Sequence, residues 1–287
     1  MKAQRIIIAL VNFALAGGLV FIDWNLGSHL ATFTAMCVVG VLAQAEIYPM
    51  FRRMGLDSEA PYGVVAALVL LLWRGLGGYT GLTPAEVQAI GAFLLVVVVV
   101  TPLIAVMLRV GPRLPGARED FERIAVTLFG LLVVWFLLSF LLELRMLDNG
   151  DGSYRFGLKA ALLLVLSVKL GDSAAYVVGR SFGVTPLTWV SPKKTWEGAG
   201  ASVAAAVLIS VVLGVLLGFT WWHMVLFGIL TNVAGQFGDL LESLIKRRSG
   251  VKDSGRIFKE MGGFLDLVDS LLLAAPVGYL FVRIVVL

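Results

Sequence analysis

The fold of this chain is decided by one stretch, Gly235 to Pro276, which reads GQFGDLLESLIKRRSGVKDSGRIFKEMGGFLDLVDSLLLAAP. It contains two apolar segments, and each carries a pair of carboxylates one helical turn apart. The pairs are Asp239 with Glu242 and Asp266 with Asp269. A carboxylate inside a bilayer costs about 2.5–3.5 kcal/mol on insertion scales. Such groups therefore usually line a polar cavity, pair with a cation or hold a metal.

A block of six cations separates the two acidic segments. They are Lys246, Arg247, Arg248, Lys252, Arg256 and Lys259. Lysine and arginine clusters of this kind form a good surface for phosphate. Together, the acids and the cations indicate metal-assisted phosphate chemistry at a membrane face.

Composition places the chain among integral membrane proteins. Of its 287 residues, 59% are hydrophobic and 15% charged, whereas soluble domains are about half apolar and about a quarter charged. We therefore predict an all-α polytopic membrane protein. The single cysteine, Cys37, excludes a disulfide framework. The chain has only two histidines, His29 and His223, which supply little for zinc-hydrolase or Ser–His–Asp chemistry. The cations are dispersed among short segments, which fits a membrane surface and argues against a nucleic-acid partner.

Hydropathy predicts about nine transmembrane helices in a single integral membrane domain, residues 1–287. The expected spans are 5–22, 30–50, 62–78, 87–108, 123–143, 156–178, 199–218, 222–245 and 264–286. Residues 1–80 would form N-terminal helices, residues 87–145 a middle pair, and residues 155–287 the catalytic helices. The first apolar run shows no clear cleavage site and is interpreted as an uncleaved helix.

Positive charge predicts the orientation of these helices. With a cytoplasmic N-terminus and nine helices, 17 of the 23 Lys and Arg residues fall on inside segments and five on outside segments or helix ends; Lys169 lies within the sixth span. Inside loops carry the excess of Lys and Arg in membrane proteins. We therefore predict a polar cavity that opens to the cytosol, in a multi-pass protein of a bacterial plasma (inner) membrane.

Three aspartates, Asp239, Asp266 and Asp269, are expected to meet in one cavity. The link of about twenty residues lets their two helices pack side by side, and the i,i+3 spacing puts Asp266 and Asp269 on one face. Converging carboxylates repel each other unless a cation intervenes, and oxygen-only ligands favour Mg²⁺ or a similar hard ion. Two alternatives stay open: neutralisation by Lys246, Lys252 or Arg256, and a proton relay in a transporter.

Two glutamates in the apolar segments are harder to interpret. Glu242 follows Asp239 by one turn and is either a supporting group behind the metal ligands or an i,i+4 partner of Lys246. Glu46 lies in the second predicted span, where the sequence offers no nearby partner. It is expected to line the cavity or the lipid entrance rather than to act in catalysis.

A second block, GDSAAYVVGRSFGVTPLTWVSPKKTWEGAGAS, runs from Gly171 to Ser202. Asp172 lies near the cytoplasmic end of the sixth span, and a salt bridge to Lys169 that stabilises the bundle is the alternative to a role in the site. Ser191 is predicted to cap a helix that has Pro192 at its first position. Exposed amides there, with Lys193 and Lys194, would form an anion site. The alternative is an ordinary cytoplasmic loop that follows the positive-inside rule.

At these residues the chain resembles the phosphatidate cytidylyltransferases, also called CDP-diacylglycerol synthases, over about Gly171 to Pro276. The upstream motif corresponds to GDSAAYVVGRSFG followed by SPKKTWEG. The downstream signature corresponds to Ser243, Lys246-Arg247, Lys252-Asp253, Gly262-Gly263 and Asp266-Leu267-Val268-Asp269. Two departures matter: Met261 ends the tripeptide where the family commonly has Pro-Gly-His, and Leu267 replaces a usual Arg. No role of that His or Arg is carried over.

The resemblance implies transfer of the cytidylyl group of CTP to phosphatidate, with release of pyrophosphate, in phospholipid biosynthesis. It implies Mg²⁺ with a second cation such as K⁺, and a homodimer among membrane lipids. The expected catalytic residues are Asp239, Asp266, Asp269 and Lys252, the three aspartates being the metal ligands. The expected phosphate contacts are Ser191, Lys193, Lys194, Lys246 and Arg256. Asp172, Glu242 and Ser243 are expected to support them.

Other functions stay open at this stage. A polyprenol or phytol kinase and a CDP-archaeol synthase also combine a cytidine nucleotide with a lipid. A transporter would use the carboxylates as relays and need no nucleotide. A degenerate homologue would bind CTP without turnover, which the missing His and Arg would explain.

Overall fold

The chain folds as a bundle of helices, seen in a computed structural model that describes residues 17–26, 28–76, 80, 82–109, 117–150, 155–255 and 262–287. Within these residues the regular secondary structure is helical, apart from turns and isolated β-bridges. The prediction of an all-α protein is therefore confirmed.

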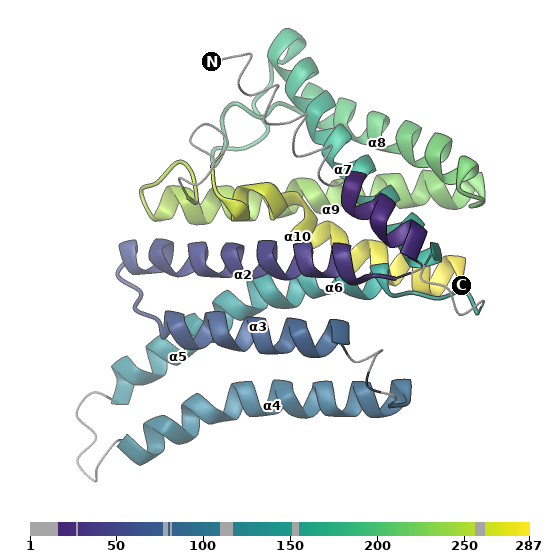
Figure 1. Ribbon diagram of the computed structural model, residues 1–287. Helices are drawn as coiled ribbons and strands as arrows, with labels where there is room; N and C mark the ends of the chain where they lie inside the picture. Colours follow the sequence, from purple (N-terminus) through teal and green to yellow (C-terminus); the bar gives the residue numbers. More distant parts are fainter. Residues whose placement is uncertain are drawn as a thin grey trace.

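The helices follow one another with short connections (Figure 1). Residues 17–26 are helical. They are followed by α2 (Leu30–Arg53), α3 (Ala60–Leu76), α4 (Pro84–Arg109), α5 (Ala117–Leu131), a π-helical segment (Leu132–Phe136), α6 (Leu137–Arg145), α7 (Arg155–Phe182), α8 (Trp196–Leu216), α9 (Trp221–Arg248), α10 (Phe264–Phe281) and a second π-helical segment (Val282–Val286). Because α5, the first π segment and α6 are continuous, they form one span.

Seven helical stretches among the described residues are long and apolar enough to cross a membrane, so the protein is a multi-pass membrane protein. They coincide with seven of the nine predicted spans, those expected at 30–50, 87–108 and from 123 onward. The span predicted at 62–78 corresponds to α3, which is apolar but shorter. Most of the span predicted at 5–22 lies outside the described residues.

Helix α10 occupies the centre of the bundle. It packs against α9, α6, α2 and α7, and the row α2, α3 and α4 continues away from it on one side (Figure 1). Half of the apolar window of α10 is buried inside the protein, compared with 11% for the window of α4. Polar side chains on α10 therefore face other helices, whereas most of the Val-rich surface of α4 is exposed on the outside of the bundle.

Glycines on α9 let the backbone of α10 come close. A Cβ atom at Gly238 would lie 2.5 Å from the carbonyl oxygen of Asp269, and one at Gly235 would lie 3.2 Å from that of Ser270. Real Cβ atoms essentially never approach a backbone atom as closely as the first of these distances. The contact between α9 and α10 at Asp269 therefore requires glycine at position 238.

The connection between α7 and α8 forms a tight, hairpin-like turn. Pro186 and Thr195 form a β-bridge, and the amide of Leu187 donates to the carbonyl of Lys194 at 2.7 Å. Helix α8 begins at Trp196, with Thr195 as its N-cap. The prediction that Ser191 caps a helix is wrong, because the Ser191 carbonyl instead accepts a hydrogen bond from Lys194 within the turn.

A buried ion pair holds the 17–26 helix at the end of the bundle where α2 begins and α6 ends. Arg145 donates to the Asp23 carboxylate at 3.3 Å, and neither side chain is more than 2% exposed. The amides of Ala31 and Thr32 donate to the same carboxylate. Burial alone would raise the pKa of Asp23, but these hydrogen bonds and the Arg145 charge outweigh it and lower that pKa. The pair therefore stays charged and fastens residues 17–26 to α2 and α6.

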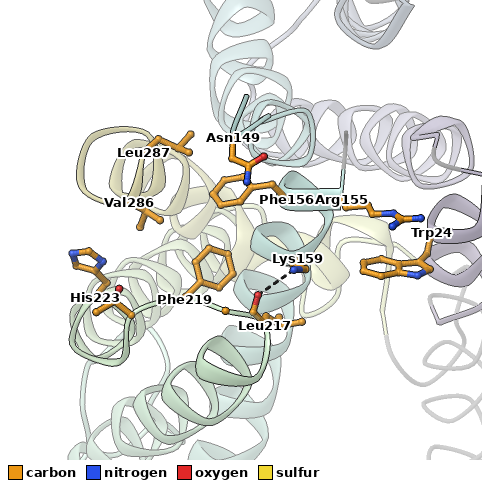
Figure 2. A pocket seen from close by; sticks show the side chains of 12 residues that line it. Trp24, Asn149, Arg155, Phe156, Lys159, Leu217, Phe219, His223, Val286 and Leu287 are labelled. Carbon is orange, nitrogen blue, oxygen red and sulfur yellow. Dashed lines mark hydrogen bonds between the residues drawn. The ribbon is translucent and has the colours of Figure 1, made fainter. Parts of the chain in front are cut away.

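A cavity of about 750 Å³ opens at that same end (Figure 2). It lies where α7 and α9 begin and where α8 and the last helical segment end.

Replacing Gly238 with alanine should destabilise the protein. The added methyl group would force α9 and α10 apart, and overpacking of this kind costs about 1–3 kcal/mol. Thermal unfolding in detergent should show a lower Tm for Gly238→Ala. Gly200→Ala is the matched control, since Gly200 is an exposed helical glycine on α8 with nothing within 4 Å of its Cβ position. Equal Tm values for the two variants would contradict the close α9–α10 contact.

Candidate functional site

An acidic group forms where α9 meets α10. One ligand oxygen each from Asp239, Glu242 and Asp269 lies within 4.8 Å of the others. Asp239 and Glu242 share a face of α9 because they are three residues apart, and Asp269 approaches them from α10 across Gly238. The structure thus brings together two of the three aspartates singled out in the sequence, and adds Glu242.

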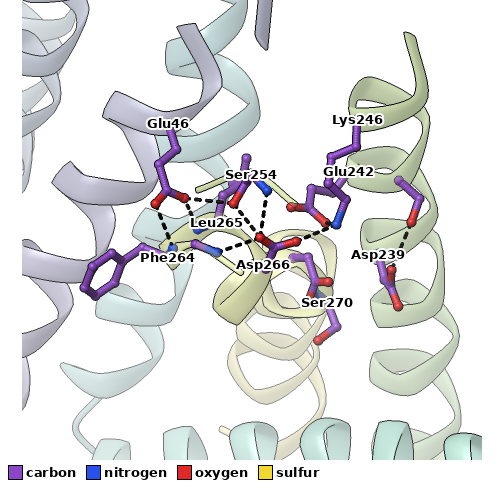
Figure 3. Close-up of polar contacts among 12 residues, drawn as sticks. Glu46, Asp239, Glu242, Lys246, Ser254, Phe264, Leu265, Asp266 and Ser270 are labelled. Carbon is purple, nitrogen blue, oxygen red and sulfur yellow. Dashed lines mark hydrogen bonds and ion pairs between the residues drawn. The ribbon is translucent and has the colours of Figure 1, made fainter. Parts of the chain in front are cut away.

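Asp266 lies outside this group and is engaged with its own helix end (Figure 3). Its Oδ2 accepts hydrogen bonds from the amide of Gly263 at 2.7 Å and from the amide and hydroxyl of Ser254 at 2.9 and 2.6 Å. Its Oδ1 accepts a hydrogen bond from the Lys246 ammonium at 2.6 Å. These contacts tie the loop after α9 to the first turn of α10.

Lys246 bridges two carboxylates rather than pointing into a cavity. Its Nζ lies 2.5 Å from Glu242 and 2.6 Å from Asp266. Both sequence interpretations of Glu242 therefore apply together, because it pairs with Lys246 and also belongs to the acidic group. Only one of its two carboxylate oxygens is paired in this way.

Glu46 anchors the start of α10 from the distant helix α2 (Figure 3). Its carboxylate accepts hydrogen bonds from the amides of Phe264 at 3.0 Å and Leu265 at 2.9 Å, and from the hydroxyl of Ser254 at 2.9 Å. These amides belong to the N-terminal turn, where backbone donors lack helical partners and favour a negative charge. Its role is thus the support of α10, and the partner that the sequence did not reveal is more than 200 residues away.

Helix α7 reaches the acidic group through Lys169. The Lys169 ammonium donates to Ser270 at 2.7 Å and to Asp269 at 3.3 Å, and it lies 3.8 Å from Asp172. The Ser270 hydroxyl in turn donates to Asp172 at 2.9 Å. The expected Lys169–Asp172 pair is present, but Lys169 serves the carboxylate on α10 more closely.

A cavity of about 670 Å³ lies beside this group, between α7, α9 and the turn before α8. Asp172, Lys193 and Lys194 line it. Lys194 connects the cavity to the acidic group, because its Nζ lies 2.6 Å from Asp239. Cationic side chains and an acidic wall thus share one cavity.

Sequence reasoning missed Tyr176, Arg180 and Gln236 as lining residues. Arg180 donates to the Tyr176 hydroxyl at 2.7 Å, and Gln236 donates to the carbonyl of Ala199 at 3.2 Å. The signal was present, since Asp172, Tyr176 and Arg180 recur every four residues on one face of α7.

The remaining sequence candidates lie around the cavity or beyond it. Ser243 donates to Asp239 at 3.3 Å, and Ser191 lies in the turn that carries Lys193 and Lys194. Lys252 is exposed in the loop after α9. Arg256 and Met261 lie outside the described residues.

Two observations test whether this group suits a cation. Glu242 Oε1 is buried without a hydrogen-bond partner in the described part of the chain. Among the residues that the structure describes, salt bridges also connect three lysines, Lys169, Lys194 and Lys246, with five carboxylates. With every group ionised, this network is formally short of two positive charges. An all-oxygen donor set with that deficit fits a hard divalent cation.

Several curated proteins similar to this chain are named phosphatidate cytidylyltransferase. A phosphatidate cytidylyltransferase from Synechocystis is 30% identical over 98% of this chain and 97% of its own length. The chloroplastic phosphatidate cytidylyltransferase 4 of Arabidopsis thaliana is 36% identical over 57% of this chain and 46% of its length. One from Brucella suis is 40% identical over 45% of this chain and 49% of its length. The chain thus spans about half the length of the chloroplast relative.

The family comparison covers nearly the whole sequence. Residues 3–285 match the family described as the cytidylyltransferase family. That range includes the acidic group, the cavity and the helices that hold them. The chain belongs to the cytidylyltransferase family.

Proposed function

We propose that this protein transfers the cytidylyl group of CTP to phosphatidate, forming CDP-diacylglycerol and pyrophosphate. Family membership and the Synechocystis relative, similar over almost its full length, support this activity. The observation that carries it is the Lys194–Asp239 contact, which joins a cationic cavity to an acidic group. A nucleotide triphosphate needs both: cations for its phosphates and carboxylates for its metal.

The cavity would hold the triphosphate of CTP. Lys193, Lys194 and Arg180 line it and offer charged donors, which form stronger hydrogen bonds to phosphate oxygens than neutral donors do. Tyr176 is held against Arg180 and would keep that guanidinium oriented. The α-phosphorus would then lie close to Asp239, at the boundary between cavity and acidic group.

Asp239, Glu242 and Asp269 would hold Mg²⁺. When bound, Mg²⁺ would neutralise the triphosphate and stabilise the charge that develops during transfer. The residues around them would set their orientation, because Ser243 donates to Asp239 and Lys169 to Asp269. Asp266 is better assigned to positioning α10, since Lys246, Ser254 and Gly263 already occupy both of its oxygens. A second cation such as K⁺ remains an expectation from the family resemblance.

The reaction itself requires no strong base. An ionised phosphate oxygen of phosphatidate attacks the α-phosphorus of CTP, and the bond from that phosphorus to the bridging oxygen of the β-phosphate breaks. Pyrophosphate leaves with the electron pair of that bond. Because the nucleophile is already charged, positioning and electrostatics should dominate.

The site would face the cytoplasm, where CTP is available. The distribution of Lys and Arg along the chain supports this orientation by the positive-inside rule. The acidic group lies toward the end of α9 and the start of α10, so lipid substrate can approach from the same leaflet. A bacterial plasma membrane fits this arrangement.

Removing one carboxylate of the acidic group should abolish transfer. We expect Asp269→Asn to lower kcat by at least about 100-fold, the scale on which single electrostatic groups act in catalysis. Pyrophosphate release from CTP, phosphatidate and Mg²⁺ measures this loss, and Tm in detergent checks folding. Glu119→Gln is the matched control, since Glu119 is an exposed carboxylate on α5, away from the acidic group, and should retain full activity. Turnover by folded Asp269→Asn would rule out the acidic group as the metal site, and CDP without pyrophosphate would indicate a kinase.

Removing the Lys194 charge should weaken CTP binding. A hydrogen bond from a charged group contributes about 1.5–3 kcal/mol, so Lys194→Gln should raise the KM for CTP by about tenfold or more. Arg248→Gln removes an exposed cation at the end of α9 and serves as control. Steady-state kinetics with varied CTP would separate the two, and an unchanged KM in Lys194→Gln would exclude the cavity as the CTP site.

Glu46 should matter for turnover although it does not line the cavity. Glu46→Ala leaves the Phe264 and Leu265 amides without their acceptor, at about 1–3 kcal/mol each, and lets the start of α10 move. Glu46→Gln keeps one acceptor oxygen and should retain more activity. We expect kcat to fall in the order wild type, Glu46→Gln, Glu46→Ala, with the KM for CTP nearly unchanged. The control Glu119→Gln changes an exposed carboxylate on α5; a large rise in KM for the Glu46 variants would contradict a positioning role.

A further inference from the structure

The cavity at the other end of the bundle is separated from the acidic group by the length of the helices. Arg155 begins α7 and lines this cavity, whereas Asp172 lies 17 residues further along the same helix. At 1.5 Å per residue the two are about 26 Å apart, close to the hydrocarbon thickness of a bilayer. The cavity therefore lies at the opposite membrane face and has no part in the proposed transfer reaction.

Its lining is cationic. Arg155 and Lys159 lie four residues apart on one face of α7 and both line the cavity (Figure 2). Like charges at this spacing repel each other. None of the twelve described lining side chains is a carboxylate. Arg155 and Lys159 therefore leave the charge of these lining side chains positive.

Both cations retain donors for a ligand. The Arg155 guanidinium lies over the Trp24 ring, 5.0 Å from its centroid, and makes no hydrogen bond or ion pair to another described residue. Lys159 donates to the carbonyl of Leu217 at 3.1 Å, which neutralises the end of α8. An ammonium group has three donors, so two remain.

The start of α9 adds to the positive field. Thr220 precedes this 28-residue helix and lines the cavity. The first amides of a helix lack intrahelical partners and carry the positive end of its dipole. The start of α9 and two cations from α7 thus lie together at one open cavity of about 750 Å³.

The surroundings favour a lipid as the source of the anion. Four of the membrane-spanning stretches begin or end at this cavity. Trp24, Phe156 and Phe219 form part of its wall, and Trp221 and Trp222 lie beside it on α9 with exposed rings. Aromatic residues of this kind gather at the level of lipid head groups. We infer that this cavity binds the phosphate head group of an anionic phospholipid in the leaflet opposite to the acidic group.

The test is binding of short-chain phosphatidylglycerol to the purified full chain in neutral detergent. This lipid carries a phosphodiester and no phosphate monoester, so it is not the proposed nucleophile. We expect it to raise the Tm of the wild type in a saturable manner and to form a one-to-one adduct in native mass spectrometry. Arg155→Gln should raise the half-saturating concentration about fivefold, because one cation near an anionic lipid surface changes the affinity by about that much. The double variant Arg155→Gln with Lys159→Gln should raise it further.

The controls separate this site from the acidic group and from general charge effects. Arg283→Gln removes an exposed cation at the same end of the bundle but outside the cavity, and Asp269→Asn alters the acidic group. Both should bind phosphatidylglycerol like the wild type. Arg155→Gln keeps the Lys159–Leu217 bond, so it remains informative if the double variant does not fold.

Three results would overturn the inference. They are equal binding by the wild type and Arg155→Gln, an equal Tm shift with phosphatidylcholine, and a shift with inorganic phosphate but none with phosphatidylglycerol. Each can occur whether or not the protein transfers cytidylyl groups, so the two proposals fail independently.

Discussion

The burial of carboxylates at the contact of α9 with α10 is the constraint on which the rest of the structure depends. Each buried charge costs several kcal/mol unless it is paired and hydrogen-bonded. The protein meets this cost by bringing one lysine from α7, one from the turn before α8 and one from α9 to the same place. Gly238 permits the close approach of α9 and α10. The net negative charge that remains in this network favours binding of a divalent cation. The arrangement of four separate segments thus follows from one electrostatic requirement.

Much of the fold could be predicted from the sequence, because apolar length is a strong signal. The run of valines in α4 and the apolar stretches of α8 and α10 predict membrane-spanning helices directly. Helices α7 and α9 extend several residues beyond the predicted spans. Their extra turns carry Arg180, Arg247 and Arg248, whose charge ends a hydropathy window although the backbone continues as a helix.

The site could be predicted in part. The residue types and their two sequence blocks indicated Asp239, Asp266 and Asp269, whereas the structure groups Glu242, in place of Asp266, with Asp239 and Asp269. Glu242 and Asp266 are both one turn from a partner, and the choice between them depends on how the helices rotate against each other. Glu46 gave no local signal, because its partners are amides of Phe264 and Leu265, and backbone donors leave no trace in a sequence.

The start of α8 shows why a local rule was insufficient. Ser191-Pro192 and Thr195 with Glu197 in the first turn are both acceptable beginnings of a helix. Thr195 is the residue that caps α8. Its hydroxyl packs against Gly179, Gly183 and Gly198, and its backbone forms a β-bridge with Pro186. As a consequence, Lys193 and Lys194 lie in a turn whose side chains reach the cavity.

Helix α2 makes the N-terminal half part of the site. The acidic group and the cavity belong entirely to α7–α10 and their connections, and the sequence blocks that resemble the family lie there too. Yet the first amides of α10 rest on Glu46, and α10 packs against α2 and α6 as well as α9. A helix whose start is held by another half of the chain cannot keep Asp269 in place by its own contacts. The acidic group is thus formed by α9 and α10, while its positioning also depends on α2, in the N-terminal half of the chain.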